Sequence, residues 1–599
     1  MASQTALHDL AGIELFRGLG REDVSALLAH MRLATIARGV ALVRQGEAAD
    51  ALYIVVSGRF AVRREGLDER LAVIGPGEPV GEIAFFAGGQ RTASVIAERD
   101  SVVGLLTLQD FEATCARLPS LARAFTRVLA GRLAATTAGR PRPSSGFPRT
   151  LAIARAGQHQ AMSRLRHMLT EFAACDPRFL LVDAAEASRM VYGDPSFDSC
   201  DATQRLNDLE ARGRILVFLC DDEPTAWTQK ALRQADCVLL VADAAVTCAA
   251  DALPGPVEVI AAELHSSGGI RLVMMHPAGR FLTGAPRWLD VRPFVSAHHH
   301  VETGSNADIG RLFRFVLGGA LGLVASGGGA FTAAHIGMHE ALVAEGYDFD
   351  ILGGTSGGAA MMAAVALGVT PAEISRRTHD MFVTRKAMGR WTWPQYSLLD
   401  PSVFDEALRE HFTDIDIADL PRPFFALATN LTRNEPMIIR RGPLWQAVRA
   451  SSAIPALLPP IYTADGDMLV DGGLIENVPI NAMRRLKTGP TVVLDLDAPP
   501  LPRCPQGTTL GLPSRAGLIS HALLRRAVPP LPEAPGPQAV LVRALMRENR
   551  DIATDLEPGD LLLKFPLPPG ASVLDWTRHH ELRWAGYDFA RAELAERPR

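Results

Sequence analysis

The chain has 599 residues, 48% of them hydrophobic and 21% charged, and its formal net charge is −5. This length exceeds what a single hydrophobic core supports, so we expect two to four domains. The composition excludes a wholly disordered chain, and the slight acidity provides no basic surface for nucleic acid. Seven scattered cysteines without a CxxC pair favour reduced thiols over a disulfide framework.

The N-terminus, MASQTALHDL, lacks the basic and apolar regions of a signal peptide, so we expect a cytoplasmic protein. Two uncharged stretches, residues 315–334 and 351–370, approach the length of a membrane span. Both are rich in glycine, and we interpret them as buried strand-loop-helix units. Peripheral contact with the inner face of a membrane stays compatible with this interpretation.

Residues 10–138 begin with short β-rich pieces bounded by glycines or charged turns, at residues 51–58, 59–65, 70–75 and 101–108. A helical pattern follows at residues 109–134. This order predicts a β-roll with a helical cap. The next segment, GRPRPSSGFPR at residues 139–149, has the composition of a linker.

From residue 150 onward the pattern changes, and apolar strand-like runs at residues 179–184, 215–220, 237–244 and 270–276 alternate with helical patterns, which predicts α/β architecture. We expect an α/β middle domain at residues 150–305. It ends near three successive histidines, His298 to His300. Adjacent strand residues point to opposite faces, and no cysteine or carboxylate nearby completes a ligand set, so we expect no metal site there.

The segment GEIAFFAGGQRTASV, residues 81–95, follows a strand and a turn and contains one cation, Arg91. A bound phosphate favours backbone N–H donors together with a fork-shaped guanidinium. Arg91 supplies that guanidinium, and Glu82 could accept hydrogen bonds from a ribose hydroxyl. The alternative is a β-roll that keeps the fold without a ligand, in which Arg91 lies at the surface paired with a carboxylate.

This segment resembles the phosphate-binding cassette of cyclic-nucleotide-binding domains. The resemblance implies that Gly81 and Glu82 face the ribose and that Arg91 and Thr92 face the cyclic phosphate of cyclic AMP or cyclic GMP, a regulatory ligand. Gly88, Gly89 and Gln90 depart from the proline that often precedes the arginine in that family.

Two glycine motifs lie close together in the C-terminal half. Gly354-Thr355-Ser356-Gly357-Gly358 follows an apolar strand and fits G-x-S-x-G, in which a sharp turn exposes the serine Oγ as a nucleophile. The run from Gly327 to Ala330 also follows a strand, and the backbone N–H groups of Gly327, Gly328, Gly329 and Ala330 are candidates for an oxyanion hole. Asp471, followed by two glycines, places a carboxylate at another strand end.

A serine nucleophile needs a base, which is usually histidine. In the order Ser–Asp–His, that base would be His521, His579 or His580, and none has a glycine-bounded position at a strand end. The motifs together resemble the patatin-like phospholipase family, over residues 322–496. The resemblance implies a Ser–Asp dyad, Ser356 with Asp471, in a domain at residues 306–499 that residues 500–599 complete.

The family's first motif usually reads GGGxRG, whereas this chain has Phe331 and Thr332 in place of arginine and glycine. The order of the parts also resembles the neuropathy target esterase family. That resemblance implies an esterase of phospholipids or lysophospholipids that requires no cofactor. The alternative is a non-catalytic sensor or scaffold that binds lipid and nucleotide, which Phe331 and Thr332 favour.

Overall fold

The computed structural model describes residues 31–66, 70–117, 126, 130, 147–157, 161–191, 194–211, 213–245, 253–265, 268–279, 283–497, 514–523, 540, 552–568 and 573–596. The chain forms two compact units, residues 1–280 with 284–317 and residues 281–283 with 318–599. Most of the predicted linker at residues 139–149 lies outside the described residues.

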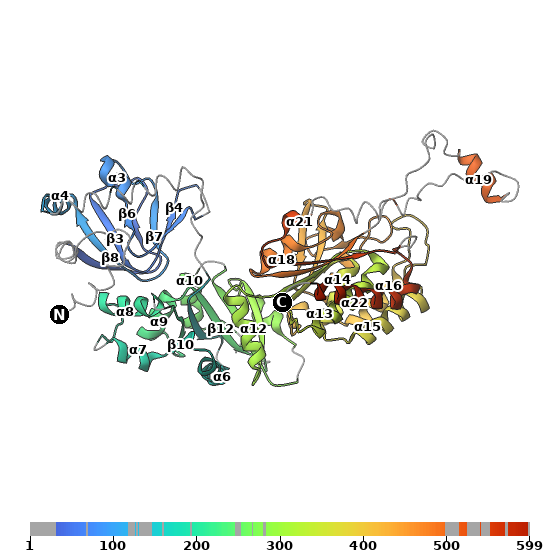
Figure 1. The fold of residues 1–599 in the computed structure, drawn as a ribbon, viewed down its shortest axis with the longest axis horizontal. Coiled ribbons are helices and arrows are strands. Elements are labelled where there is room, and N and C mark those ends of the chain that lie inside the picture. The colour runs from blue at the N-terminus through green and yellow to red at the C-terminus, as the bar shows by residue number, and fades with distance from the viewer. Residues whose placement is uncertain are drawn as a thin grey trace. The chain divides into compact units, whose positions relative to one another are not determined.

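The first part of the first unit is a β-roll of two antiparallel four-stranded sheets (Figure 1). The buried side chains of Val55, Phe60 and Val103 form its core. Two helices accompany it, α3 (Glu82–Ala87) and α4 (Leu108–Arg117). The predicted β-roll is confirmed, and its strands are β1 (Arg32–Ile36), β8 (Ser101–Thr107), β3 (Ala51–Ser57) and β6 (Pro79–Val80) in one sheet, and β2 (Ala41–Val43), β7 (Ser94–Ala97), β4 (Phe60–Arg63) and β5 (Ala72–Ile74) in the other.

The second part of the first unit is a six-stranded parallel sheet with helices, which confirms the predicted α/β middle region. The strand order is β10 (Phe179–Val182), β11 (Ile215–Leu219), β9 (Thr150–Arg155), β12 (Cys237–Asp243), β13 (Ile270–His276) and β14 (Ala297–Glu302). The helices are α6 (Ala161–Cys175), α7 (Ala184–Met190), α8 (Cys200–Ala211), α9 (Ala226–Gln234), α10 (Pro256–Leu264), α11 (Ala285–Asp290) and α12 (Asn306–Val316).

Two details of this sheet differ from the sequence-based expectation. The strand β9 lies between β11 and β12 in the sheet, yet the sequence had not marked it as a strand. Helix α12 buries Leu312 and Phe313 in the core of the first unit. The division between the units therefore lies after residue 317, later than the expected start of the hydrolase domain at residue 306.

Buried ion pairs join the β-roll to the α/β part of the same unit. Asp100, in the turn before β8, accepts bonds from Lys230 Nζ at 2.8 Å and Arg233 Nε at 2.9 Å, both on α9. Asp236, just after α9, accepts a bond from Arg99 at 3.0 Å. The β-roll therefore contacts the next domain through charged side chains directly, and not only through the chain segment that links them.

We expect Asp100→Ala to destabilise the first unit by about 3–5 kcal/mol, because it leaves the fully buried Lys230 ammonium without its carboxylate. Calorimetric unfolding measures this loss, and Lys230→Met in the same chain should recover much of it. The control is Asp201→Ala, which breaks an exposed pair with Arg205 and should cost about 0.5 kcal/mol or less. An equal loss of unfolding free energy in Asp100→Ala and Asp201→Ala would contradict a larger contribution from the buried pair.

The second unit is built on an eight-stranded mixed sheet. Along the sheet lie β19 (Ile461–Tyr462), β20 (Met468–Asp471), β17 (Phe424–Asn430), β16 (Ile351–Thr355), β15 (Gly322–Ala325), β21 (Thr491–Asp497) and β22 (Leu561–Pro566), while β18 (Glu435–Ile439) pairs with β17. The helices are α13 (Ala333–Ala344), α14 (Gly357–Ala366), α15 (Pro371–Thr378), α16 (Ser402–Phe412), α17 (Leu444–Ser451), α18 (Ile480–Leu486), α19 (Arg515–Leu523), α21 (Ile552–Asp555) and α22 (His579–Ala595).

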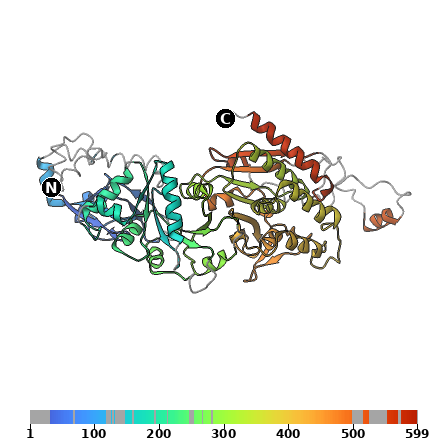
Figure 2. The same ribbon diagram turned by 90° about the horizontal axis from the view of Figure 1, so that it is seen from below.

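The C-terminal segment contributes a strand and a long helix to this unit. Strand β22 pairs in parallel with β21, and α22 packs along α13 (Figure 2). The two helices approach closely at two glycines. A Cβ atom on Gly337 would lie 1.8 Å from the carbonyl oxygen of Arg583, and one on Gly586 would lie 2.3 Å from that of Ala334. Larger residues at these positions would push the helices apart.

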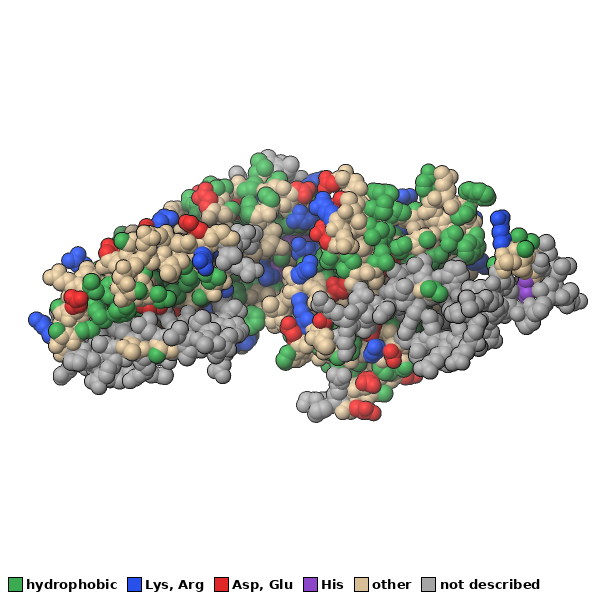
Figure 3. Space-filling model, turned by 90° about the horizontal axis from the view of Figure 1, so that it is seen from above, with side chains coloured by type: hydrophobic (Ala, Val, Ile, Leu, Met, Phe, Trp, Pro, Cys, Tyr) green, Lys and Arg blue, Asp and Glu red, His purple; other side chains and the backbone are tan. Residues whose placement is uncertain are grey.

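Both glycine-rich apolar stretches noted in the sequence form buried strand-loop-helix units, β15 to α13 and β16 to α14. Within the part of the chain that the structure describes, no helix has the length and apolarity needed to cross a membrane. The surface of the second unit carries hydrophobic patches with lysine and arginine side chains among them (Figure 3).

Candidate active site

The register of strand β17 brings Ser356 and Asp471 together. Leu427 pairs with Thr355, the last residue of β16, and Ala428 pairs with Asp471, the last residue of β20. Since β18 pairs with β17 over the same residues, β16 and β20 must share the opposite edge. Thr355 and Asp471 therefore lie one β17 residue apart, roughly 3.3 Å along that strand, and Ser356 directly follows Thr355 toward Asp471.

Ser356 occupies a sharp turn between β16 and α14. Its φ is 53° and its ψ is −127°, a region that non-glycine residues adopt only under strain. The turn needs small neighbours, because a Cβ atom on Gly358 would lie 2.4 Å from the carbonyl oxygen of Ser326. The Ser356 N–H donates to Ser451 Oγ at 2.8 Å, and that hydroxyl donates to the Leu427 carbonyl at 2.6 Å. Ser451 thus holds the turn against the sheet.

Asp471 is a buried carboxylate directly beside this serine. The Gly473 N–H donates a hydrogen bond to it at 2.8 Å, and the Ser356 side chain lies close enough to stabilise its charged form. Burial raises the pKa of Asp471 to about 6, although these two polar neighbours act in the opposite direction. At neutral pH the group is an ionised carboxylate that is a better proton acceptor than an exposed aspartate.

The glycine run after β15 lies against Ser356, because a Cβ atom on Gly327 would be 3.1 Å from Ser356 Cβ. Two of its four candidate donors are occupied by the protein. Gly327 N–H donates to the Asn477 carbonyl at 3.2 Å, and Ala330 N–H donates to the Val573 carbonyl at 2.7 Å. No described residue accepts a bond from the N–H of Gly328 or Gly329. Of the four N–H groups predicted as oxyanion donors, from Gly327 to Ala330, those of Gly328 and Gly329 therefore remain available.

The departure from the family motif is accommodated by packing. Phe331 is 5% exposed and belongs to the hydrophobic core of the unit. Thr332 is fully buried, and its hydroxyl donates to the Gly329 carbonyl at 2.7 Å. Under the same loop, His335 Nε2 lies 3.0 Å from the Ser326 carbonyl, and burial lowers the pKa of His335 to about 4. The loop is therefore fixed by hydrogen bonds without the family's arginine.

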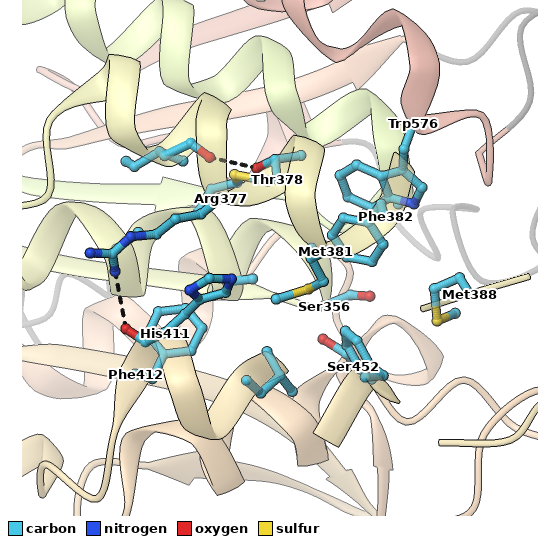
Figure 4. A pocket seen from close by; sticks show the side chains of 18 of the residues that line it. Ser356, Arg377, Thr378, Met381, Phe382, Met388, His411, Phe412, Ser452 and Trp576 are labelled. Atoms are coloured by element: carbon cyan, nitrogen blue, oxygen red, sulfur yellow. Dashed lines mark hydrogen bonds between the residues drawn. The ribbon is translucent and has the colours of Figure 1, made fainter. Parts of the chain in front are cut away.

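A pocket of about 820 Å³, including the part open to solvent, extends from Ser356 into the unit (Figure 4). Its lining is mostly apolar and includes Met361, Met381, Phe382, Phe404, Leu408 and Phe412. His411 and Arg377 line it at a position away from Ser356, where Arg377 donates to the His411 carbonyl at 3.1 Å. A pocket of this lining suits a hydrocarbon chain.

The C-terminal segment also contributes to this site. Val573 accepts the hydrogen bond from Ala330, and Leu574 and Trp576 line the pocket. The Trp576 ring stacks on Phe382, with ring centroids 3.7 Å apart. The sequence had predicted that residues 500–599 complete the hydrolase domain, without naming these contacts.

The three histidines considered as alternative bases make other contacts. His579 Nδ1 lies 2.8 Å from the Trp576 carbonyl, and His580 Nδ1 lies 3.1 Å from Ser375 Oγ. His521 lies on α19. Among the described residues that line the pocket, His411 is the single histidine, and the carboxylate that interacts with Ser356 is Asp471.

In the β-roll, the candidate nucleotide residues are adjacent to one another. Arg91 is 4% exposed and donates to the carbonyls of Gly81 at 2.8 Å and Ala51 at 2.6 Å. Glu82 is buried at the start of α3, and Thr92 is exposed. Arg91 is thus neither at the surface nor held by a carboxylate, contrary to the alternative expected for a ligand-free roll. Its two bonds use two of the five N–H donors of a guanidinium.

The three successive histidines lie on β14, where His299 and His300 are buried. Burial holds the pKa of His299 well below its usual range, and Arg271 lies 3.2 Å from its Nε2. Among the described residues, no group of three or more histidine, cysteine, aspartate or glutamate side chains could hold a metal ion.

Comparison with known proteins identifies three parts of the chain. Residues 34–117 match the cyclic nucleotide-binding domain, and residues 323–484 match the patatin-like phospholipase family. Residues 194–314 match the P-loop-like domain of the neuropathy target esterase family. In the order of these three parts, the chain is similar to the patatin-like proteins of the neuropathy target esterase family.

Two relatives in this family are the neuropathy target esterases sws of Drosophila melanogaster and Drosophila persimilis. The first is 28% identical over 76% of this chain and 35% of its own length. The second is 29% identical over 74% of this chain and 34% of its own length. This chain therefore spans about a third of their length. Among solved structures, the catabolite activator protein of Thermus thermophilus is 33% identical over 21% of this chain and 61% of its own, at a TM-score of 0.20.

In the α/β part of the first unit, which includes the P-loop-like match, a carboxylate of the protein itself occupies the turn after β9. A P-loop holds phosphates with the N–H groups of this turn. Here Gly157 N–H donates to Glu258 at 2.9 Å, and Glu258 forms a fully buried pair with Arg292 at 2.6 Å. That N–H donor is therefore already satisfied within the protein.

Three residues of the patatin-like site were not predicted as site residues: Ser451, Asn477 and Trp576. Ser451 and Asn477 lie within residues 322–496, over which the chain resembles the patatin-like family, so that resemblance was the available signal. Trp576 follows a proline-rich stretch that reads as loop, and no sequence pattern assigns it to the pocket.

Proposed function

We propose that the second unit is a serine acyl hydrolase acting on lysophospholipids or related acyl esters, with Ser356 as nucleophile and Asp471 as base. The observation that carries this proposal is the position of Ser356 beside the buried Asp471 carboxylate at one end of an apolar pocket. This arrangement suits an amphiphilic ester. The apolar lining would hold its acyl chain, and the polar pair would meet its carbonyl group.

In the first half of the reaction, Ser356 Oγ attacks the ester carbonyl while Asp471 takes its proton. The tetrahedral oxyanion accepts hydrogen bonds from the N–H groups of Gly328 and Gly329. As the intermediate collapses, the carbon–oxygen bond to the leaving alcohol breaks, and Asp471 returns the proton to that oxygen. An acyl-enzyme on Ser356 remains.

In the second half, water attacks the acyl-enzyme and Asp471 takes the proton of that water. The same N–H donors hold the second oxyanion. Its collapse breaks the bond to Ser356 Oγ, Asp471 returns the proton to that oxygen, and the fatty acid leaves. The strained, glycine-flanked turn keeps Oγ at the pocket and the backbone close to the glycine loop. The acyl chain lies along the apolar lining throughout both steps.

The test is hydrolysis by purified full-length protein of a lysophospholipid panel that varies acyl length and head group. We expect fatty acid release that depends more on acyl length than on head group, because the apolar pocket contacts the acyl chain. Absence of turnover across the panel, with a folded protein, would favour a non-catalytic lipid-binding role.

We also propose that the β-roll binds a cyclic nucleotide through Gly81, Glu82, Arg91 and Thr92, as a regulatory ligand. Arg91→Ala should weaken cyclic AMP or cyclic GMP binding most, since Arg91 is the cation of the segment. Arg91→Lys should also lose affinity, because lysine keeps the charge but not the fork geometry. Calorimetric titration measures both.

The matched control is Arg63→Ala, an exposed arginine at the end of β4 in the same roll, which should leave affinity unchanged. No binding heat for either nucleotide with wild-type protein would contradict the proposal. Regulation requires in addition that the nucleotide prefers one of two conformations, so esterase rates with and without ligand test it separately.

A further inference from the structure

Three aromatic side chains project from one short segment of the second unit. Within residues 389–396, here called the aromatic loop, Trp391 is 64% exposed, Trp393 84% and Tyr396 81%. Large aromatic side chains in globular proteins are usually buried, so several on one exposed loop indicate a surface used for binding. Tryptophan and tyrosine are also the residues that favour the boundary between water and lipid.

The aromatic loop is a folded element. Trp391 and Leu399 form an antiparallel bridge, and the Thr392 N–H donates to the Leu398 carbonyl at 3.1 Å. Leu398 N–H and Leu399 N–H donate to the carbonyls of Ala456 and Leu457. These bonds fix the backbone at the base of the loop to the body of the unit. Binding through the aromatic rings would therefore lose little backbone conformational entropy.

The loop also adjoins the pocket that contains Ser356. Met388, the residue directly before the loop, lines that pocket. Ile454 also lines it and lies two residues before Ala456, which accepts a bond from the base of the loop. Figure 4 shows Met388 on the same side of the view as Ser356 and Trp576, with His411 and Phe412 on the other side. A surface that docks through the loop would lie next to the pocket.

The charge around the loop favours an anionic surface. Lys386 and Arg390 are exposed, and the carboxylate that interacts with Arg390, Asp400, balances the charge of only one of these two cations. Arg385, by contrast, pairs with Asp380 at 2.8 Å and Glu410 at 2.7 Å. Two cations beside three interfacial aromatics match the charge of anionic phospholipid head groups.

We propose that the aromatic loop docks the second unit on a lipid bilayer that contains anionic phospholipid, beside the entrance used by the acyl chain. The docking surface rests on the exposure, order and charge of the loop. Only its benefit, delivery of substrate from the membrane to Ser356, rests on the proposed function. Docking should therefore persist in a Ser356→Ala variant, which allows binding and catalysis to be tested apart.

The experiment is co-sedimentation of the full chain with phosphatidylcholine vesicles, with and without phosphatidylglycerol. We expect Trp391→Ala with Trp393→Ala to lower the partition coefficient at least about tenfold, because two large apolar side chains no longer enter the interface. Lys386→Ala and Arg390→Ala should each lower it roughly fivefold, and only with phosphatidylglycerol. The control is Trp584→Ala, a 53% exposed tryptophan on α22, which should bind like wild type.

Hydrolysis separates failure of docking from failure of the proposed function. The double tryptophan variant should lose activity on vesicle-embedded lysophospholipid while keeping wild-type turnover of a soluble aryl ester. Unchanged vesicle binding by that variant, or equal loss with Trp584→Ala, would overturn the docking proposal. Vesicle binding without any ester turnover would leave docking supported and contradict the hydrolase instead. Stoichiometric capture of a protein by the loop, without vesicle binding, would assign the surface to a protein partner.

Discussion

Replacing Ser356 with alanine should abolish ester hydrolysis, with a loss of at least about 10⁴-fold, in line with nucleophile removal in other serine hydrolases. The side chain provides the attacking oxygen. The other described hydroxyl that donates to Asp471, that of Thr429, donates to its backbone carbonyl and not to its carboxylate. The fold should persist, because the backbone bond from residue 356 to Ser451 does not involve the Oγ atom. Rates on a lysophospholipid and circular dichroism of the same preparation check both statements.

A second substitution at this position separates catalysis from folding. Ser356→Gly also removes the nucleophile, yet glycine adopts a φ of 53° without strain. The glycine variant should therefore be inactive but more stable than the alanine variant, by an amount on the order of 1 kcal/mol. Turnover in either folded variant would remove Ser356 from the mechanism.

Replacing Asp471 with asparagine should lower the hydrolysis rate by at least roughly 10²-fold, the lower range for a positioned general base. Asparagine fills the same space and can still accept a hydrogen bond from Gly473, so the loss reports proton transfer. In the wild type, the rate should fall as pH drops through about 6, the pKa of the buried Asp471 carboxyl, because protonation removes the base. Rates measured from pH 4 to pH 8 should show this limb, and the variant should lack it.

The same pKa predicts a stability effect of definite sign. Burial raises the pKa of Asp471 from 3.8 to about 6, so the folded state binds a proton that the unfolded chain has released between these values. The contribution of this carboxyl to the free energy of unfolding is therefore greatest below pH 3.8. It falls as the pH rises from 3.8 and is lost above about pH 6. Asp471→Asn should remove this dependence and be more stable than wild type above pH 6.

The control for a histidine base is the set His521→Ala, His579→Ala and His580→Ala. None of these should approach the loss in Asp471→Asn, since His579 and His580 contact Trp576 and Ser375 instead. A larger loss in any one of them would assign the base to that histidine and would turn the dyad into a triad.

Much of the fold could be predicted because the determining patterns are local. The segments before Gly327 and Ser356 are apolar runs that lead into glycine-rich turns, and both form β-strands followed by helices. The β-roll and the α/β middle region were likewise visible in strand-like and helical periodicity. Strand β9 was missed because Thr150–Arg155 contains an arginine and follows a linker-like stretch, so its central place in the sheet depends on contacts distant in sequence.

The candidate site could be predicted in its motifs but not in its contacts. Which N–H groups of Gly327 to Ala330 are available depends on Asn477 and Val573, residues far away in sequence. The consequence of Phe331 and Thr332 also depends on packing, since a buried phenylalanine and a bonded threonine hydroxyl replace the expected arginine and glycine. In the β-roll, the bonds from Arg91 to two carbonyls follow from tertiary structure alone.

The central claim, that Ser356 is an activated nucleophile in the apolar pocket, has a direct measurement. Full-length protein is reacted with a long-chain alkyl fluorophosphonate, digested and analysed by mass spectrometry. We predict one phosphonylated peptide carrying the adduct on Ser356, formed much more slowly in Asp471→Asn and slowed by competing lysophospholipid. An adduct on another residue, or no adduct on folded wild-type protein, would contradict the claim.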